Sequence, residues 1–202
     1  MKDTYLTISG ASEGEYSEKK SKFLAFAHHV ELPEEVKEIV SEYKKQYYDA
    51  RHVCYAYMLG SKRDVFRAVD DGEPSGTAGK PILGQLNSRE LTDILVVVVR
   101  YFGGIKLGTS GLIEAYREAA VSVLDNATVE ERTVNARVRV TYDYALMNAV
   151  MRVVKEEEPR ICLQDFQLRC VLELEIRKSK LENLLNKFRL IREAKVELIE
   201  EG

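Results

Sequence analysis

Residues 93–102, with the sequence DILVVVVRYF, constrain the fold more than any other part of the chain. This continuous apolar run is rich in valine, and such runs are typical of strands that are covered on both faces. We therefore expect the central strand of a sheet here, with further structure packed on each side. The run leads directly into a glycine-dense segment at residues 100–111, RYFGGIKLGTSG.

The composition is that of an ordinary globular protein. The chain has 202 residues, of which 45% are hydrophobic and 31% are charged, so it can bury a sizeable core in one or two compact domains. Its formal net charge of -3 gives no general attraction for nucleic acid, and any such binding would need a local patch. The first residues do not resemble a secretory leader, and no apolar run is long enough to span a bilayer. We therefore expect a cytoplasmic protein with no membrane partner.

The three cysteines are Cys54, Cys162 and Cys170, and none of them forms a Cys-x-x-Cys pair. This spacing disfavours a disulfide framework or a zinc site. Each cysteine lies in an apolar, strand-like setting, so we expect all three to be buried.

Hydrophobic periodicity outlines the elements of the first part of the chain. Besides the central strand, the pattern predicts strands at residues 5–9, 22–30, 53–59 and 129–134. Helices are expected to begin near Pro33 and near Thr109, where Thr109 or Ser110 would cap free backbone amides. Two stretches lack such a pattern: the charged residues 12–20, expected to form an exposed hairpin or loop, and residues 60–80, whose irregularity is typical of a functional loop.

From residue 136 onward the pattern is βαββαβ, which is the order of a ferredoxin-like, split βαβ sandwich. Its helices are expected at residues 145–156 and 179–190, the second opened by a capping box of Ser179 and Glu182. The middle strands are expected at residues 160–166 and 168–177. We therefore assign an α+β fold class with two domains, residues 1–135 and 136–202.

Seven of the twelve glycines lie in two segments, residues 70–81 (DDGEPSGTAGKP) and residues 100–111. Glycine allows backbone turns that other residues resist, and surfaces of this kind usually recognise another molecule. A strand that feeds a glycine loop into a helix N-terminus exposes amides that attract phosphate or carboxylate, and Arg100 and Lys106 would reinforce this attraction. The alternative is a tight strand-to-helix turn whose glycines serve local geometry only.

Neither glycine segment matches a nucleotide-binding fingerprint. Pro81 follows Lys80 where a phosphate-binding loop needs Ser or Thr, and Lys106 stands where a dinucleotide fingerprint needs glycine. The chain also contains no nucleophile-elbow sequence and no histidine pair at metal-ligand spacing. These observations disfavour nucleophilic and zinc catalysis and indicate no cofactor.

The acidic part of the first segment has two interpretations. Asp70, Asp71 and Glu73, with Ser75 or Thr77 as further oxygen ligands, would suit a hard divalent cation. Aspartate and glycine are also common turn residues, so the same segment is compatible with an ordinary solvated turn. His52, at the start of a predicted strand, would act as an acid, a base or a phosphate contact, or would be a structural residue.

Three stretches together resemble the YigZ/IMPACT family: ARH at residues 50–52, DDGEPSGTAGKPIL at residues 70–83, and VVVVRYFGGIKLGTSGL at residues 96–112. The resemblance covers nearly the whole chain and implies a bacterial two-domain member. It implies that the first domain has the fold of the second domain of a small-subunit ribosomal protein, and that the second resembles a C-terminal domain of elongation factor G.

Both analogies point toward the translation apparatus, and no catalytic mechanism comes with them. Eukaryotic members regulate the amino-acid-starvation response partly through an extra N-terminal domain that is absent here, so that role is not carried over. We therefore expect a non-enzymatic binding or regulatory protein linked to translation, which contacts RNA, the ribosome or a ribosome-associated protein, or a small anion. The alternative is a divalent-metal-dependent enzyme that acts on a small phosphorylated or carboxylated substrate.

The expected contact surface combines both glycine segments with nearby cations. It comprises Arg51, His52, Asp70, Asp71, Glu73, Ser75, Gly76, Thr77, Lys80, Arg100, Gly103, Gly104, Lys106, Gly108, Thr109 and Ser110.

Overall fold

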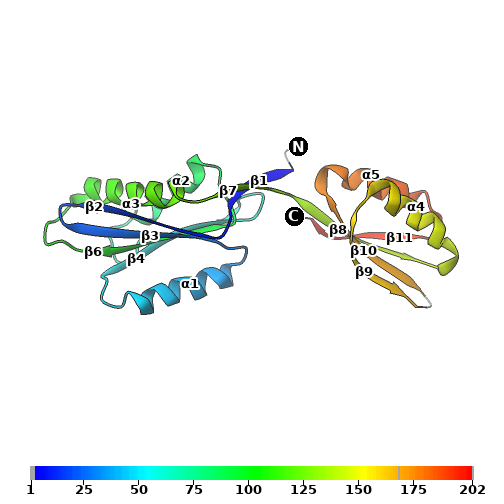
Figure 1. The fold of residues 1–202 in the computed structure, drawn as a ribbon, viewed down its shortest axis with the longest axis horizontal. Helices are drawn as coiled ribbons and strands as arrows, with labels where there is room; N and C mark the ends of the chain where they lie inside the picture. Colours follow the sequence, from blue (N-terminus) through cyan, green and yellow to red (C-terminus); the bar gives the residue numbers. More distant parts are fainter. Residues whose placement is uncertain (1–2, 168, 202) are drawn as a thin grey trace. The chain divides into compact units, whose positions relative to one another are not determined.

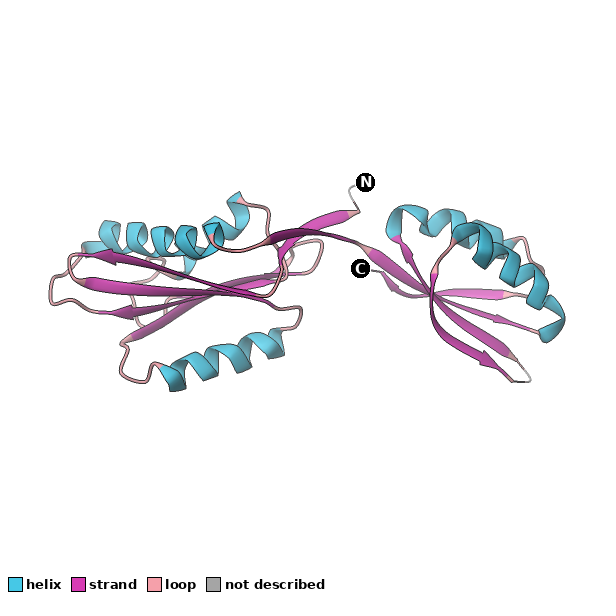
Figure 2. Ribbon diagram, viewed as in Figure 1, coloured by secondary structure: helices cyan, strands magenta, loops and turns pink. Residues whose placement is uncertain are grey.

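The computed structural model describes residues 3–167 and 169–201 (Figure 1). Contacts divide the chain into two compact units: Tyr5–Arg132, here called the N-terminal unit, and residues 3–4 with 133–201, here called the C-terminal unit. Each unit combines a sheet with helices (Figure 2), which confirms the predicted α+β class. Among the described residues, no helix has the length and apolar character needed to cross a membrane.

The N-terminal unit is built on a five-stranded sheet in the order β2-β3-β6-β4-β5. All neighbouring strands are antiparallel. The strands are β2 (Ala11–Glu18), β3 (Ser21–His29), β4 (His52–Leu59), β5 (Val65–Val69) and β6 (Ile94–Tyr101). The valine-rich run forms β6 in the middle of the sheet, as predicted, and its residues Ile94 to Val99 are 0% exposed.

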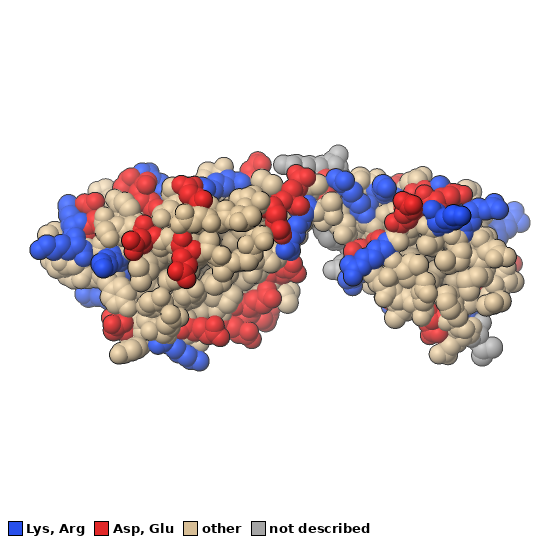
Figure 3. Space-filling model, in the orientation of Figure 1, with Lys and Arg blue, Asp and Glu red and all other residues tan. Residues whose placement is uncertain are grey.

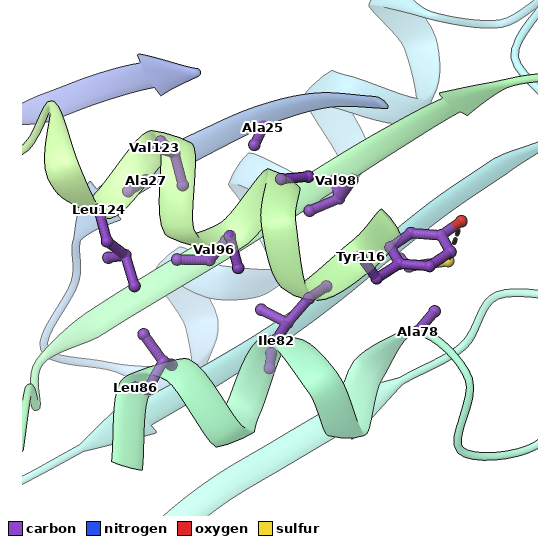
Figure 4. Packing of buried hydrophobic residues seen from close by; sticks show 14 of the residues in the cluster. Ala25, Ala27, Ala78, Ile82, Leu86, Val96, Val98, Tyr116, Val123 and Leu124 are labelled. Atoms are coloured by element: carbon purple, nitrogen blue, oxygen red, sulfur yellow. Dashed lines mark hydrogen bonds between the residues drawn. The ribbon is translucent and has the colours of Figure 1, made fainter. Parts of the chain in front are cut away.

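Helices cover both faces of this sheet, with α1 (Pro33–Gln46) on one face and α2 (Gly79–Ser88) and α3 (Gly108–Asp125) on the other (Figures 1 and 2). Successive residues of β6 point to opposite faces, so this strand contributes to two cores. Val96 and Val98 pack in the core that contains Tyr116 of α3 (Figure 4). Leu95 and Val97 belong to the core with residues of α1. A separate two-stranded sheet pairs β1 (Thr4–Ile8) with β7 (Val129–Thr133).

The C-terminal unit has the predicted βαββαβ order, with a four-stranded sheet in the order β11-β8-β10-β9. Its elements are β8 (Asn135–Tyr142), a 3₁₀ turn (Tyr144–Leu146), α4 (Met147–Glu157), β9 (Arg160–Phe166), β10 (Cys170–Arg177), α5 (Lys178–Arg189) and β11 (Lys195–Glu201). Alternate residues of β10 are buried beneath the helices, while Glu173 and Arg139 form an ion pair on the other face of the sheet. Leu168, the predicted first residue of a middle strand, lies outside the described residues.

The two stretches that lacked a sequence pattern contain regular structure. The predicted hairpin at residues 12–20 is confirmed, since residues 12–18 belong to β2, which pairs with β3 along its whole length, and residues 19–20 form the turn. A Cβ atom at Gly14 would lie 2.5 Å from the amide nitrogen of Val123, so glycine is needed where α3 approaches this strand. Residues 60–80 were expected to be irregular, and this prediction is wrong for β5 and for the start of α2. β5 is short and lies mostly exposed at the edge of the sheet, so its sequence does not alternate.

The predicted side-chain cap of α3 is wrong. The helix begins at Gly108, Leu107 occupies the N-cap position, and no side chain caps it. Thr109 and Ser110 therefore lie inside the first turn.

The predicted capping box of α5 is also wrong, because the helix begins at Lys178 and places Ser179 inside it. The carboxylate of Asp3 accepts hydrogen bonds from Arg177 and Ser179 instead, and these bonds hold the pKa of Asp3 well below its ordinary value. Asp3 thus makes the contacts at the start of α5 that Ser179 and Glu182 were expected to make.

Two of the three cysteines, Cys54 and Cys170, are buried as predicted, whereas Cys162 is exposed. Cys162 lies on β9 at the edge of the sheet, where only Ile161 and Asp165 are even partly buried. An edge position therefore overrides the apolar neighbours that suggested burial.

The domain limits of residues 1–135 and 136–202 stay a prediction. The compact units differ from these limits at residues 3–4 and 133–135. The amide of Val134 donates to the carbonyl oxygen of Asp3 at 2.7 Å, and the amide of Lys178 donates to that of Val134 at 2.9 Å. These bonds join the first described residues to the C-terminal unit.

Candidate functional site

A cleft of about 460 Å³ opens in the N-terminal unit. Three segments that are distant in the sequence line it: residues 51–52 at the start of β4, residues 72–74 of the acidic loop, and residues between 100 and 112 that connect the end of β6 to α3. The two glycine-dense segments thus meet at one site. A larger hollow of about 550 Å³, lined by β2, β3, α1 and the end of α3, contains none of the predicted site residues.

The register of the sheet places the side chain of Arg100 at the bottom of this cleft. Arg100, near the end of β6, pairs with His52 of β4 on one side and with Phe23 of β3 on the other. The Nη1 atom of Arg100 donates to Glu73 Oε1 at 2.5 Å. The exposed fractions of these side chains are 8% for Arg100 and 3% for Glu73. A pair buried to this degree is sensitive to the loss of either partner, because the other charge would then be left uncompensated.

The guanidinium of Arg100 is not fully satisfied. Its carbon atom Cζ lies over two aromatic rings, 5.6 Å from the ring centroid of Phe23 and 5.7 Å from that of Phe102. Its Nε atom is buried and has no hydrogen-bond partner among the described residues. A buried donor without an acceptor is costly, which makes this atom unusual in a folded protein.

His52 presents its second ring nitrogen to the same pair. Its Nδ1 atom lies 2.8 Å from the carbonyl oxygen of Asp71, which requires Nδ1 to be the protonated donor. The Nε2 atom lies 3.9 Å from Glu73 Oε1. Gly72 has a φ of +88°, and a Cβ atom there would lie 3.3 Å from His52 Nδ1, so glycine allows the loop to pack on the imidazole.

Tyr116 and Cys54 lie behind the pair and are kept protonated. The Tyr116 hydroxyl donates to Glu73 Oε1 at 2.8 Å, and the Cys54 sulfur lies 3.3 Å from that hydroxyl and 2.9 Å from the Asp70 carbonyl oxygen. Burial raises the pKa of both groups well above their ordinary values, and the neighbouring acidic groups add to this effect. Since the thiolate is the reactive form of cysteine, Cys54 is a poor nucleophile at neutral pH.

The three carboxylates of the acidic loop face different partners, which contradicts the alternative interpretation of this loop as a divalent-cation site. Asp70 accepts backbone hydrogen bonds from Gly76, Ala78 and Gly79 at 2.8, 3.1 and 2.9 Å. Asp71 accepts from Lys44 Nζ and from the Val53 amide, while Glu73 holds Arg100. Within the described residues, no group of three or more His, Cys, Asp or Glu side chains could hold a metal ion. These carboxylates shape the loop and the cleft floor.

Asp70 keeps its negative charge because of these backbone contacts. Partial burial alone would raise the pKa of Asp70, but the three N–H groups outweigh that effect and hold the pKa below its ordinary value. Asp70 thereby fixes the turn that precedes α2. Gly79 serves the same turn, since a Cβ atom there would lie 2.4 Å from the Val69 amide nitrogen.

Two cations at the cleft lack partners. Arg51 and Lys106 line it, both are exposed, and neither makes a hydrogen bond or ion pair within the described part of the chain. The first turn of α3, which also lines the cleft, carries no side-chain cap. On the face drawn in Figure 3, the N-terminal unit carries both acidic and basic side chains. A local excess of positive charge is therefore the electrostatic feature of the cleft.

The structure separates the predicted site residues into two groups. Those that line the cleft are Arg51, His52, Glu73, Arg100, Lys106, Gly108 and Thr109. The others lie outside the lining: Asp70, Asp71, Ser75, Gly76, Thr77, Lys80, Gly103, Gly104 and Ser110. Gly103 has a packing role, since its Cβ atom would lie 2.0 Å from the carbonyl carbon of Lys20. Its amide is also engaged, donating to Ser21 Oγ at 3.1 Å.

The predicted site residues do not include the apolar side chains that line the cleft. Phe102, Leu107, Leu112 and Pro74 line it, and Tyr116 supports it from the core. The contact of the Tyr116 hydroxyl with Glu73 joins residues far apart in the chain, so it leaves no local signal in the sequence. Phe102 directly follows β6 in the chain. It is 44% exposed in the structure, whereas Ile94 to Arg100 of β6 are buried.

Comparison with known proteins gives a consistent match. The family model of the Impact N-terminal domain matches residues 19–124 of the sequence, a range that contains every segment of the cleft. The IMPACT family member YvyE of Bacillus subtilis (strain 168) is 39% identical over 158 residues, which cover 78% of this chain and 73% of YvyE. The IMPACT family member YigZ of Escherichia coli (strain K12) is 34% identical over 164 residues, 80% of each protein.

A solved structure supports the same fold over the whole chain. The crystal structure of a hypothetical protein superposes with a TM-score of 0.76, at 29% sequence identity, and covers 100% of both chains. The similarity thus includes both compact units.

Proposed function

The chain belongs to the IMPACT family, and from that premise we propose that it is a non-enzymatic regulatory protein of translation that acts in the cytoplasm by docking on RNA, including the RNA of the ribosome. The link to translation follows the family resemblance. The RNA contact follows the chemistry of the cleft. A ribosome-associated protein as the direct partner is the alternative outcome of the experiment below.

The observation that carries the proposal is the positive charge at the cleft. Arg51, Lys106 and the uncapped start of α3 face the same opening, and none of these groups is neutralised by a described residue. Lysine, arginine and helix N-termini are the groups that proteins use to hold phosphate. Because the net charge of the chain is -3, binding would be confined to this surface.

The remaining residues support binding over catalysis. Burial keeps the thiol of Cys54 and the hydroxyl of Tyr116 protonated. Asp70 and Asp71 are committed to backbone groups and to Lys44. Arg100 was expected to grip an anion directly, and its ion pair with Glu73 engages the Nη1 atom of its guanidinium at the cleft floor.

The proposal predicts a specific salt dependence of RNA binding. The binding constant of a labelled single-stranded RNA should fall linearly with salt on logarithmic axes, and Arg51→Ala or Lys106→Ala should each reduce the slope by about 0.7, because each removes one phosphate contact. Fluorescence anisotropy at several salt concentrations measures this slope. Lys62→Ala is the matched control, because Lys62 is an exposed cation outside the cleft lining.

Binding that does not respond to salt would contradict the proposal. Co-sedimentation with ribosomes that persists unchanged after nuclease treatment would instead identify a protein partner.

A further inference from the structure

We infer that the cleft recognises a terminal phosphate monoester carried on a group with an apolar face, and that a nucleoside 5′-monophosphate unit is the ligand that fits it. The inference rests on the proposed function, since it names the chemical group that the same cleft would hold. The nucleoside 5′-monophosphate could come from two sources: it could be a free mononucleotide or the phosphorylated 5′ end of an RNA.

The charge of the lining favours a dianion. The charged residues that line the cleft are the cations Arg51, Arg100 and Lys106 and the anion Glu73, which leaves an excess of two positive charges. A phosphate monoester carries about −1.5 to −2 charges at neutral pH. An internal phosphodiester or a carboxylate carries a single charge and would leave a cation uncompensated.

Arg100 lies at the bottom of the cleft, and its guanidinium is only partly paired. Arg100 lines the cleft with a side chain that is only 8% exposed, and its Nε atom has no partner among the described residues. Glu73 uses the Nη1 atom, while the described residues supply no acceptor for the Nη2 atom. A phosphate oxygen suits this position, because hydrogen bonds between arginine and phosphate are charge-assisted and strong.

The start of α3 supplies a second, independent contribution. α3 has 18 residues and begins with Gly108 and Thr109 at the cleft, without a side-chain cap. Gly108 has a φ of +74° and open space where a Cβ atom would be, so an approaching group meets backbone there. The free amides and the helix dipole favour a negatively charged group at this position.

The depth of Arg100 in the cleft favours a phosphate at the end of the ligand over a phosphate within an RNA strand. A side chain this deeply buried is accessible to a terminal group, whereas an internal phosphodiester would have to bring flanking nucleotides into the cleft from both sides. The cleft volume of about 460 Å³ lies in the range of small-molecule sites. A single nucleotide unit is therefore the appropriate size.

The apolar wall suits a base or sugar. Leu107 and Leu112 line the cleft beside Phe102, whose side chain remains 44% exposed. Nucleobases stack on exposed aromatic rings with little dependence on their sequence. The phosphate would therefore lie toward Arg100 and the start of α3, with the nucleoside against Phe102.

Calorimetric titration of the full chain with uridine 5′-monophosphate, uridine and inorganic phosphate tests the inference. We expect the monophosphate to bind at least tenfold more tightly than uridine, because the phosphate makes the charged contacts. Inorganic phosphate should bind more weakly than the monophosphate, because it lacks the stacking group. Equal binding of uridine and its monophosphate would overturn the inference.

Variants locate the binding at the cleft. Arg51→Ala combined with Lys106→Ala should weaken monophosphate binding about tenfold or more, and Phe102→Ala should weaken it by removing the surface on which the base stacks. Lys62→Ala should leave the affinity within twofold, and thermal unfolding should confirm that each variant is folded. Unchanged affinity in the double variant would also overturn the inference.

Two RNA octamers of one sequence, with a 5′-phosphate or a 5′-hydroxyl, identify the source. Preferential binding of the phosphorylated octamer, in competition with the monophosphate, supports the RNA end. Monophosphate binding with no RNA binding supports the free mononucleotide, and the proposed function then fails while this inference stands. Salt-dependent RNA binding without any monophosphate binding leaves the proposed function in place and overturns the inference.

Discussion

At the residue scale, Glu73 organises the floor of the cleft. Its carboxylate accepts hydrogen bonds from Arg100 and Tyr116 and lies 3.9 Å from His52, so one side chain connects the acidic loop to β4, β6 and α3. The Glu73 side chain is only 3% exposed. A charged network in such surroundings is stable only when all its members are paired.

We therefore predict that Glu73→Ala lowers the free energy of unfolding by about 3–5 kcal/mol, because Arg100 would be left buried without a counter-charge. Urea denaturation measures the change. Glu114→Ala is the matched control on α3, since its pair with Arg117 is exposed and should contribute less than about 1 kcal/mol. Equal stability of the Glu73 variant and the wild-type protein would show that the pair is not a structural unit.

At the scale of elements, the loop between β5 and α2 is held by one carboxylate. Asp70 accepts the backbone N–H groups of Gly76, Ala78 and Gly79, which carries the chain from the edge strand into the helix. This arrangement explains why a segment without hydrophobic periodicity is nevertheless well defined. It also positions Glu73 and the loop beside His52.

The depressed pKa of Asp70 gives this element a predictable pH dependence. The stabilisation should be fully present above the ordinary aspartate pKa of about 4 and should be lost as the pH falls through the lower pKa of the folded state. Asp70→Asn should therefore cost about 1–2 kcal/mol at pH 7, and the difference from the wild-type protein should shrink below pH 4. Chemical denaturation at several pH values measures this difference. Asp64→Asn, at an exposed position, should show no such trend.

At the scale of the whole molecule, the chain contains separate hydrophobic cores. The clusters of the N-terminal unit and the cluster of the C-terminal unit share no residue. The cleft lies entirely in the N-terminal unit. Stability and binding are therefore expected to be separable properties of the two units.

Core truncations should act within one unit. Ile82→Ala in the N-terminal unit and Leu184→Ala in the C-terminal unit remove side chains that are 0% exposed, and each should cost about 2–5 kcal/mol. Hydrogen exchange should lose protection within residues 5–132 for the first variant and within residues 133–201 for the second. Loss of protection in both units from either variant would show that they unfold together.

The amino-acid sequence by itself determined the features that depend on local patterns. The valine run identified β6 as the central strand, alternation identified the βαββαβ order, and clustered glycines marked both segments of the cleft. Such patterns are readable because the face of a strand or helix that is buried repeats with a short period. The edge strand β5 escaped this reasoning because its residues are mostly exposed and do not alternate. The helix α2 escaped it although Ile82 and Leu86 share one buried face, because it is only ten residues long and begins inside the glycine-dense segment.

Only the tertiary structure decided which residues meet. The register of β4 against β6 places His52 opposite Arg100, and the fold of the acidic loop brings Glu73 onto that arginine. The same long-range contacts bring Asp3 to the start of α5 and remove Asp70 and Asp71 from any shared site. Pairing between residues far apart in the chain follows from strand register and loop closure, and neither leaves a periodic trace in the sequence.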